Sequence, residues 1–592
     1  MSPQEIETLV DVALGNKKAD LIIKGGSLLN VYTGELLKGY SVAIKGERIA
    51  YVGENSDHTA GEGTQLIDAQ GKVLIPGLID GHTHFYSSVD EFLRYSMVCG
   101  TTSIVTETLE IGCSTGYAGV ISFLENLKDQ PIKLFALAPA MELVPGSIGQ
   151  GSTISDKEME QLLNLDEILG LGETMWTAVL EKDQQVLGYF ARALSQKKRV
   201  EGHSAGAKGN RLVAYIASGI SSCHEPINTE EALERLRLGI HVMIREGSIR
   251  RELEAISQIK DKGIDFRRLV LVTDGLSPED LVTYGHMDYL VQKAINLGFD
   301  PIVAIQMATI NPAEHFSLDH LIGGIAPGRY ADILIIPDLR TIHCEYVISN
   351  GQIIAKNKKL LVEPRKCVYP QSLLRSIHLP KKLNPEDFAV SARGENGKAR
   401  VRVISIVSDL ITEESAAELP VVDGLVQMDV ERDVLKVSVI DRYENSGTVF
   451  TGFVTGFGIE SGAIATSYTW TRGCPIIAIG ADEQDMAHAV NHIAELNGGL
   501  VVCKKGAILE ELPLPLGGVT PSCPIEEAAY KVRHITKLIA KLGSSLSKPF
   551  LTLQTLPSPV LPFFRISQGG LINLREKRIV DLFFEPYPGD EI

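Results

Sequence analysis

Between about Lys72 and Pro327 the sequence alternates short apolar runs with segments of helical spacing. Strands that alternate with helices form a parallel sheet covered by helices, and about 250 residues is the usual length of eight such units closed into a barrel. We expect eight strands, at residues 73–75, 102–107, 132–139, 168–173, 199–203, 219–225, 241–246 and 269–274. The sequence therefore predicts an α/β fold with a (β/α)8 TIM-like barrel over residues 72–328.

The segments on both sides of this region have a different pattern, with short strand-like runs separated by turn residues. Such runs occur at 20–26 and 41–53, after a helix expected over 1–15, and again at 331–336 and 347–354. We predict a small β-sandwich domain built from both flanks, residues 1–71 and 329–368, with the barrel inserted between them. Strands at 401–407 and 435–441 and a helix at 482–496 predict an additional α+β C-terminal domain over 369–592.

The composition narrows the class of function. A chain of 592 residues is too long for one hydrophobic core, and its net charge of −17 disfavours a nucleic-acid or anionic-membrane partner. We find no apolar run long enough to span a bilayer and no export signal at the N-terminus. The eight cysteines include no C-x-x-C pair, which is typical of reduced thiols. We predict a cytoplasmic protein that acts on a small molecule, without a nucleic-acid or membrane partner.

Several of the expected barrel strands end in a histidine or a carboxylate. In a barrel of this kind the carboxyl ends of the strands meet at one face, so these side chains should converge. They are His82, His84, Glu107, Glu173, His203, His224, Glu225, Glu246 and Asp274. Imidazole and carboxylate groups bind divalent transition metals, and a bound metal turns water into hydroxide at neutral pH. With Asp274 as the group that moves the proton, such a site would hydrolyse a carbon bearing an amine or amide.

Each of these residues also has an ordinary explanation when it is taken alone. Glu173 could be a solvated loop carboxylate, and Asp274 followed by Gly275 is a common turn pair. His203 and His224 could be core histidines with satisfied hydrogen bonds. Taken together these explanations weaken, because at least four of eight strands would have to end in a metal-type residue by accident. His488 and His492 lack the glutamate of H-E-x-x-H, and an exposed helix face explains them better.

The motifs resemble those of the amidohydrolase superfamily, and more closely those of its adenine deaminase family, over nearly the whole chain. The matching stretches are 76–84, 201–203, 214–225, 243–248, 273–274, 285–288, 307–314, 325–328, 456–458 and 512–515. The resemblance implies hydrolysis of adenine to hypoxanthine and ammonia by a metal-activated hydroxide in a binuclear site. The metals typical of the family are Mn²⁺ and Fe²⁺, and Zn²⁺ is also possible.

The resemblance also implies roles for individual residues. His82, His84 and Asp274 would hold one metal ion, His203 and His224 the second, and Glu173 would bridge the two. Asp274 would double as the proton shuttle and Glu225 would meet a ring nitrogen of the purine. We also predict that Glu246 contacts the substrate and that the protein is a homo-oligomer.

Three stretches depart from the family pattern. Glu107-Thr108-Leu109-Glu110 stands in place of Asp-Pro-His-Glu, and Thr273-Asp274-Gly275 in place of Thr-Asp-Asp. Residues 470–475 replace a His-Asp-Ser-His-Asn run of the C-terminal domain, and both histidines are gone. Two alternatives therefore stay open: a metal-dependent hydrolase of another purine or of a cyclic amide, and a non-catalytic relative that would bind no metal.

Overall fold

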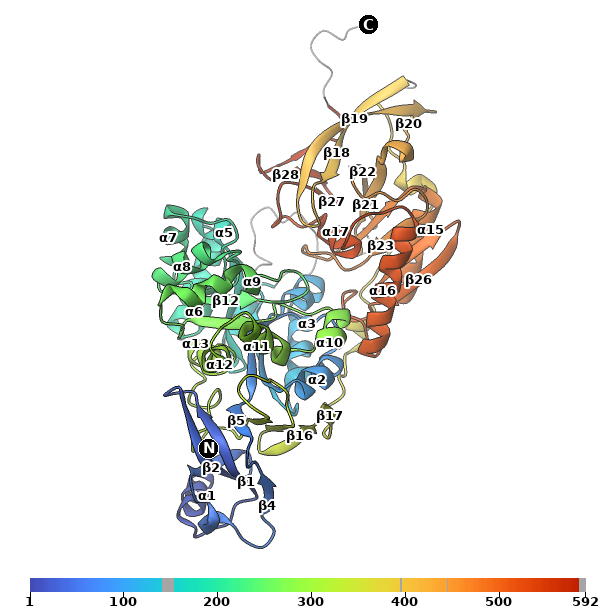
Figure 1. Ribbon diagram of the computed structural model, residues 1–592. Coiled ribbons are helices and arrows are strands. Elements are labelled where there is room, and N and C mark those ends of the chain that lie inside the picture. Colours follow the sequence, from blue (N-terminus) through green and yellow to red (C-terminus); the bar gives the residue numbers. More distant parts are fainter. Residues whose placement is uncertain (141–153, 394–396, 444–445, 585–592) are drawn as a thin grey trace. The chain divides into compact units, whose positions relative to one another are not determined.

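The computed structural model describes residues 1–140, 154–393, 397–443 and 446–584. The described chain divides into two compact units (Figure 1). The first unit contains residues 1–108, 124–140 and 160–367. The second contains residues 109–123, 154–159 and most of the chain after 368.

The two flanks of the barrel form one nine-stranded sheet in the first unit. Its order is β17-β16-β15-β14-β5-β1-β2-β3, with β4 beside β1. The strands are β1 (Leu21–Asn30), β2 (Glu35–Lys45), β3 (Arg48–Gly53), β4 (Gln65–Asp68), β5 (Val73–Pro76), β14 (Ile333–Ile336), β15 (Tyr346–Ser349), β16 (Gln352–Lys356) and β17 (Lys359–Leu360). β5 pairs antiparallel with β14, with Ile75 opposite Leu334. The predicted β domain is thus assembled from both flanks, after the predicted helix α1 (Pro3–Leu14).

One strand expected in the barrel lies in this sheet instead. The apolar run from Val73 to Ile75 forms β5, and the first barrel strand is β6 (Leu78–Thr83). The chain passes from one sheet to the other at Gly77, where an added Cβ would lie only 2.0 Å from the Thr102 hydroxyl oxygen. An apolar run shows that a strand is buried but not which sheet buries it, and the sequence prediction therefore misplaced this one.

The barrel contains eight parallel strands, as predicted. A five-stranded sheet has the order β10-β9-β8-β7-β6, and a three-stranded sheet has the order β11-β12-β13. Beyond β6 these are β7 (Thr101–Thr106), β8 (Lys133–Ala138), β9 (Ile168–Met175), β10 (Arg199–His203), β11 (Ser222–Cys223), β12 (His241–Arg245) and β13 (Leu269–Val272). Backbone hydrogen bonds from Asp274 to His82 and from Ser221 to Val200 join the two sheets at both seams.

Helices follow the barrel strands. They are α2 (Val89–Val98), α3 (Leu109–Leu127), α4 (Asp156–Leu163), α5 (Trp176–Leu180), α6 (Gln184–Ser195), α7 (Asn210–Ile216), α8 (Thr229–Arg237), α9 (Leu253–Ile256), α10 (Pro278–Tyr284), α11 (Met287–Asn296), α12 (Pro301–Gln306) and α13 (Ile310–His315). α10 and α11 are separate helices because Gly285 between them has a φ of 96°. Asn228 caps α8 and accepts a hydrogen bond from the Glu231 amide.

The second unit contains the predicted α+β domain. Its main sheet has the order β20-β19-β18-β22-β21-β24-β23-β25-β26, and β27, β28 and β29 form a smaller one. The strands are β18 (Gly397–Ile406), β19 (Thr412–Val422), β20 (Leu425–Val426), β21 (Leu435–Ile440), β22 (Val449–Thr455), β23 (Ala463–Thr466), β24 (Ile476–Gly480), β25 (Gly499–Lys504), β26 (Ala507–Pro513), β27 (Phe564–Ser567), β28 (Gly570–Asn573) and β29 (Arg578–Val580). Its helices are α14 (Gln371–Leu374), α15 (Glu483–Leu496), α16 (Ile525–Lys541) and α17 (Pro549–Thr555).

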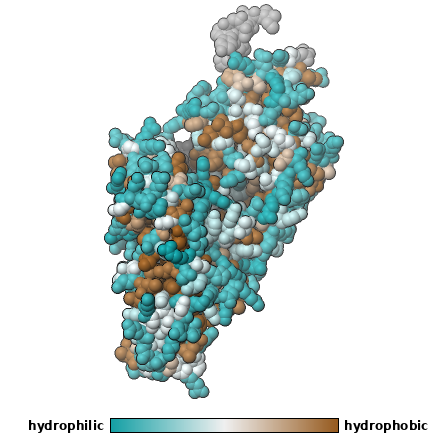
Figure 2. Space-filling view, in the orientation of Figure 1, coloured by the Kyte–Doolittle hydropathy of each residue, from teal (hydrophilic) through white to brown (hydrophobic). Residues whose placement is uncertain are grey.

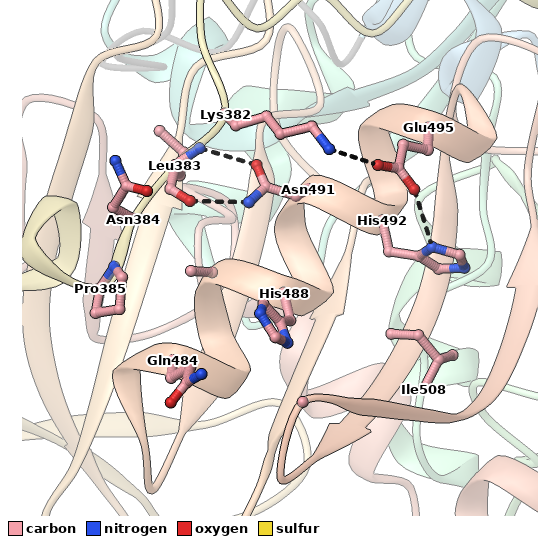
Figure 3. Close-up of a pocket in the computed structure, with 12 residues that line it drawn as sticks. Lys382, Leu383, Asn384, Pro385, Gln484, His488, Asn491, His492, Glu495 and Ile508 are labelled. Carbon is pink, nitrogen blue, oxygen red and sulfur yellow. Dashed lines mark hydrogen bonds and ion pairs between the residues drawn. The ribbon is translucent and has the colours of Figure 1, made fainter.

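A pocket of about 420 Å³ lies on α15 of this second unit (Figure 3). The Asn491 side chain accepts a hydrogen bond from the Leu383 amide and donates one to the Leu383 carbonyl oxygen. These two bonds hold the segment around Leu383 against α15. His492 pairs with Glu495 and Glu511, so both of its nitrogens already have acidic partners. His488 is exposed, as predicted for this helix face.

Hydrophilic residues cover most of the face shown in Figure 2, and hydrophobic ones occur in separate groups. Within the part of the chain that the structure describes, no helix is both long and apolar enough to cross a membrane.

Candidate metal centre

The six predicted metal ligands lie together at the carboxyl ends of the barrel strands. They form three overlapping groups whose ligand atoms lie within 4.8 Å of one another: His82, His224 and Asp274; His82, His84 and Glu173; and Glu173, His203 and His224. Five of the six side chains are buried, and His203 is partly exposed. Among the described residues no other group of three such ligands occurs. Residues that are up to 192 positions apart in the sequence therefore form one cluster.

A buried polar network fixes His82 and Asp274 beside each other. Asp80 on β6 accepts hydrogen bonds from the Thr273 hydroxyl (2.6 Å) and the Thr273 amide (3.2 Å). The hydroxyl oxygens of Thr83 and Thr273 are also hydrogen-bonded, at 2.7 Å. These bonds join β6 to the end of β13. Asp274 then adopts a φ of 51°, a left-handed conformation that aspartate tolerates better than most residues.

Glu107 and a glycine position Glu173. The Glu173 amide donates to Glu107 Oε1 at 3.0 Å. An added Cβ at Gly172 would lie 2.1 Å from Glu107 Oε2, so glycine leaves the room that this carboxyl group occupies. Burial, and then the nearby Glu173, raise the pKa of Glu107 to about 8. Glu107, one of the residues predicted at strand ends, thus positions Glu173 by accepting the hydrogen bond from its amide.

Glu173 faces imidazoles on two sides. Its Oε1 lies 3.5 Å from His84 Nε2, and its Oε2 lies 2.6 Å from His203 Nδ1 and 3.1 Å from His224 Nε2. Burial alone would raise the pKa of Glu173, but the imidazoles of His203 and His224 outweigh it and hold that pKa well below its usual range. The carboxylate is therefore central to the cluster.

Arg245 connects two carboxylates of the cluster and was missed by the sequence analysis. Its Nη1 lies 2.8 Å from Glu225 Oε1 and 3.2 Å from Asp274 Oδ2. Burial opposes ionisation of both carboxyl groups, but Arg245 and the neighbouring histidines lower the pKa of each well below its usual value. Alternation along β12 places Arg245 on the inner side once Met243, two residues earlier, is known to belong to the inner barrel core, and that is known only from the structure.

Glu246 lies apart from the other predicted site residues. Its carboxylate pairs with Lys293 of α11 at 2.6 Å. Because alternate side chains of a strand point to opposite faces, Glu246 lies on the helix side of β12 while Arg245 lies on the inner side. The Glu246 carboxylate is therefore paired outside the cluster while the adjacent Arg245 lies in it, and the substrate contact of Glu246 stays a prediction.

The cluster fits a divalent metal. His82 Nε2 is buried without a hydrogen-bond partner, although Asp274 Oδ1 is only 3.3 Å away. Such an unsatisfied buried nitrogen is costly unless something else binds it. Imidazole nitrogens and carboxylate oxygens are together the donor set of zinc, iron and manganese sites. The chain thus has a parallel barrel with a metal-type cluster at its carboxyl face, the arrangement of a metal-dependent hydrolase.

The comparisons with known proteins agree with this class. Residues 73–358 match the amidohydrolase family, and residues 409–578 match the adenine deaminase C-terminal domain. The chain is 39% identical over 582 residues to an adenine deaminase of Moorella thermoacetica, with 97% of each chain covered. It is 37% identical over 587 residues to an adenine deaminase of Clostridium botulinum, with 98% of each covered. The chain therefore belongs to the adenine deaminase family of the amidohydrolases.

Among the solved structures to which the chain is similar is the beta-aspartyl dipeptidase of Fervidobacterium islandicum AW-1. It is 18% identical, with a TM-score of 0.46, and the match covers 57% of this chain and 97% of the dipeptidase.

Proposed function

We propose that this protein hydrolyses adenine to hypoxanthine and ammonia at a centre of two divalent metal ions in the barrel. The observation that carries this proposal is the convergence of all six ligand positions into one buried cluster. The near full-length similarity to adenine deaminases supports the substrate.

The proposed ligand assignment divides the cluster in two. His82, His84 and Asp274 would hold one ion and His203 and His224 the other, with Glu173 available to both. The two oxygens of Glu173 support a bridging role, because one faces His84 and the other faces His203 and His224. We propose Mn²⁺ or Fe²⁺ as the native metal, and Zn²⁺ also suits these donors. A bound ion supplies Lewis acidity that makes hydroxide available from water at neutral pH.

The proposed role of Asp274 follows from its two oxygens. Oδ1 faces the imidazoles of His82 and His84, at 3.3 and 3.6 Å, while Oδ2 is held by Arg245. Asp274 takes the proton that the attacking water loses and delivers it to the departing amine. Water thus supplies the oxygen that replaces the amino group, and the nitrogen leaves as ammonia.

We propose that Glu225 contacts a ring nitrogen of the purine. Its Oε1 lies 3.0 Å from His224 and its Oε2 3.2 Å from His203, so it borders the half of the cluster opposite His84. A carboxylate at this edge can accept a hydrogen bond from a ring N–H.

The structure gives a physical reason for one of the three departures from the family pattern. Gly275 has a φ of 86°, and an added Cβ would lie 2.7 Å from the Tyr86 ring. Tyr86 in turn lies nearly parallel to the His84 ring, with centroids 6.3 Å apart. An aspartate in place of Gly275 would therefore meet the Tyr86 ring. The other two departures have no comparable explanation in the structure. Leu109 begins α3, and residues 470–475 lie in the second unit.

The decisive experiment measures ammonia release and loss of adenine absorbance by manganese-loaded protein. Adenine is compared with a panel of substituted purines and cyclic amides. Turnover of adenine above the panel supports the proposal, whereas turnover of a panel member alone would assign the site to another purine or a cyclic amide.

The site assignment has its own test. The double variant H82A/H84A should lose bound metal and turnover, and H488A, on the exposed face of α15, should keep both. Full turnover by a folded H82A/H84A variant would refute the assigned ligands.

We also propose that the protein acts in the cytoplasm as a homo-oligomer. None of the eight cysteines, all of which lie in the described residues, forms a disulfide bond, which fits a reducing compartment. Light scattering of the purified protein measures the oligomeric state directly, and a monomeric mass would refute that part.

A further inference from the structure

We propose that Arg245 is a positioning residue that fixes Asp274 and Glu225 relative to each other for the deamination reaction, an inference that rests on the proposed function. A single nitrogen makes the connection. Arg245 Nη1 lies 2.8 Å from Glu225 Oε1 and 3.2 Å from Asp274 Oδ2. The proposed proton shuttle and the proposed purine contact are therefore held by the same hydrogen-bond donor.

The strand order explains how Arg245 reaches both partners. β12, which ends at Arg245, lies between β11 and β13. Glu225 follows β11 and Asp274 follows β13, so the two carboxylates come from the neighbours on either side. Arg245 pairs directly with Val272 in the ladder, two residues before Asp274. The guanidinium therefore bridges three adjacent strand ends at the carboxyl face of the barrel.

Glu252 fixes Arg245 through two contacts, one to the side chain and one to the backbone. Its Oε2 lies 3.1 Å from Arg245 Nε, and its amide donates to the Arg245 carbonyl oxygen at 3.1 Å. The side chains of Arg245 and Glu252 are only 9% and 8% exposed. A planar guanidinium offers donors in fixed directions, whereas a lysine offers one compact charge. Only arginine can bind Glu252 through Nε and bridge the other two carboxylates through Nη1.

This bridge determines how Asp274 is oriented. With Oδ2 held by Arg245, Oδ1 is directed at His82 Nε2 and His84 Nε2. Without the guanidinium, Asp274 and Glu225 would be two buried carboxylates that repel each other, and either could rotate. A displacement of about 1 Å in a reacting group can cost about 100-fold in rate.

The test uses the full-length, metal-loaded protein and three variants. We expect R245A and R245K to lower kcat for adenine about 100-fold and to raise KM, with unchanged bound metal, because Asp274 and Glu225 lose the same donor. Millimolar guanidinium should partly restore R245A, because it can refill the vacated position, and sodium chloride at equal ionic strength should not. R251A is the matched control, because Arg251 lies on the loop after β12, pairs with Asp280 of α10 and is 39% exposed, and it should keep the kcat of the unmodified protein.

The outcomes separate this inference from the proposed function. Failure of the unmodified metal-loaded protein to release ammonia from adenine would overturn both. Normal turnover by the unmodified protein together with normal kcat in R245A would overturn only the positioning role. Loss of metal in parallel with kcat, without rescue by guanidinium, would make Arg245 a purely structural ion-pair partner. If R245A does not fold, E252Q replaces it: a loosened guanidinium should lower kcat with metal retained, and an unchanged kcat would refute the inference.

Discussion

Replacing Gly247 by alanine tests how rigidly the carboxyl face of the barrel is held. Gly247 follows β12 and lies against the end of β13. An added Cβ would be 1.8 Å from the Thr273 carbonyl oxygen and 2.6 Å from the Gly275 carbonyl oxygen. These two backbone groups flank Asp274, so the substitution presses directly on the segment that carries the proposed proton shuttle.

The geometry sets the expected size of the effect. A carbon and a carbonyl oxygen in close contact are about 3.3 Å apart, so the two strand ends must separate by about 1.5 Å. Both neighbours are backbone atoms and cannot move aside as a flexible side chain would. Overpacking of this kind costs about 1–3 kcal/mol in the free energy of unfolding. A misplacement of about 1 Å at a catalytic group lowers kcat about 100-fold, equivalent to about 2.7 kcal/mol in the activation barrier.

The assay compares G247A with G188A. Gly188 lies on the exposed side of α6, where an added Cβ meets no atom within 4 Å. G188A should therefore keep kcat and gain up to about 1 kcal/mol in stability, since glycine is unfavourable in a helix. We expect G247A to lower both kcat for adenine and the midpoint of thermal unfolding. A G247A variant with the kcat and midpoint of the unmodified protein would show that the strand ends separate at no cost, which would refute the reasoning.

Three further predictions concern the metal, Glu246 and His241. Dialysis against a chelator should abolish ammonia release, and Mn²⁺ or Fe²⁺ should restore it; activity that survives complete metal removal would contradict the metal centre. E246Q should lower the thermal midpoint, because it weakens the pair with Lys293, but leave KM for adenine unchanged, whereas E225Q should raise KM; equal KM effects would contradict their separate placement. Burial, and then the adjacent His315, lower the pKa of His241 to about 3, so the folded chain keeps His241 neutral where the unfolded chain protonates it. Below about pH 6.5 this histidine should therefore cost up to about 1.4 kcal/mol of stability per pH unit, and H241N should reduce the slope in urea unfolding between pH 7 and 5; an unchanged slope would refute the cause.

The sequence identified most of the cluster because the relevant information is local. Each of His82, Glu173, His203 and Asp274 lies at the end of an apolar run, and the carboxyl ends of parallel strands meet at one face. The positions of the strand ends and the alternation of side chains therefore predicted the site, and no knowledge of contacts between distant segments was needed. The same reasoning predicted the flanking sheet, since hairpin patterns occur on both sides of the barrel.

Other features depend on which strands pair, and local sequence patterns do not predict them. Val73 to Ile75 has the composition of any buried strand, and its pairing with β14, more than 250 residues away in the sequence, assigns it to the flanking sheet. The junction at Gly77 depends on the Thr102 side chain of another strand. Such boundaries follow from contacts between distant segments, which periodicity does not contain.

The sequence by itself determined the barrel, the flanking sheet and the set of strand-end histidines and carboxylates that contains the cluster, because strand periodicity and residue chemistry are properties of short segments. Only the tertiary structure decided that Arg245, and not Glu246, enters the site. Arg245 ends β12 and Glu246 follows it directly, and the face that each side chain occupies depends on the register of β12 between its two neighbours. The buried pairs that follow, Arg245 with Asp274 and Glu246 with Lys293, exist only once that register is set.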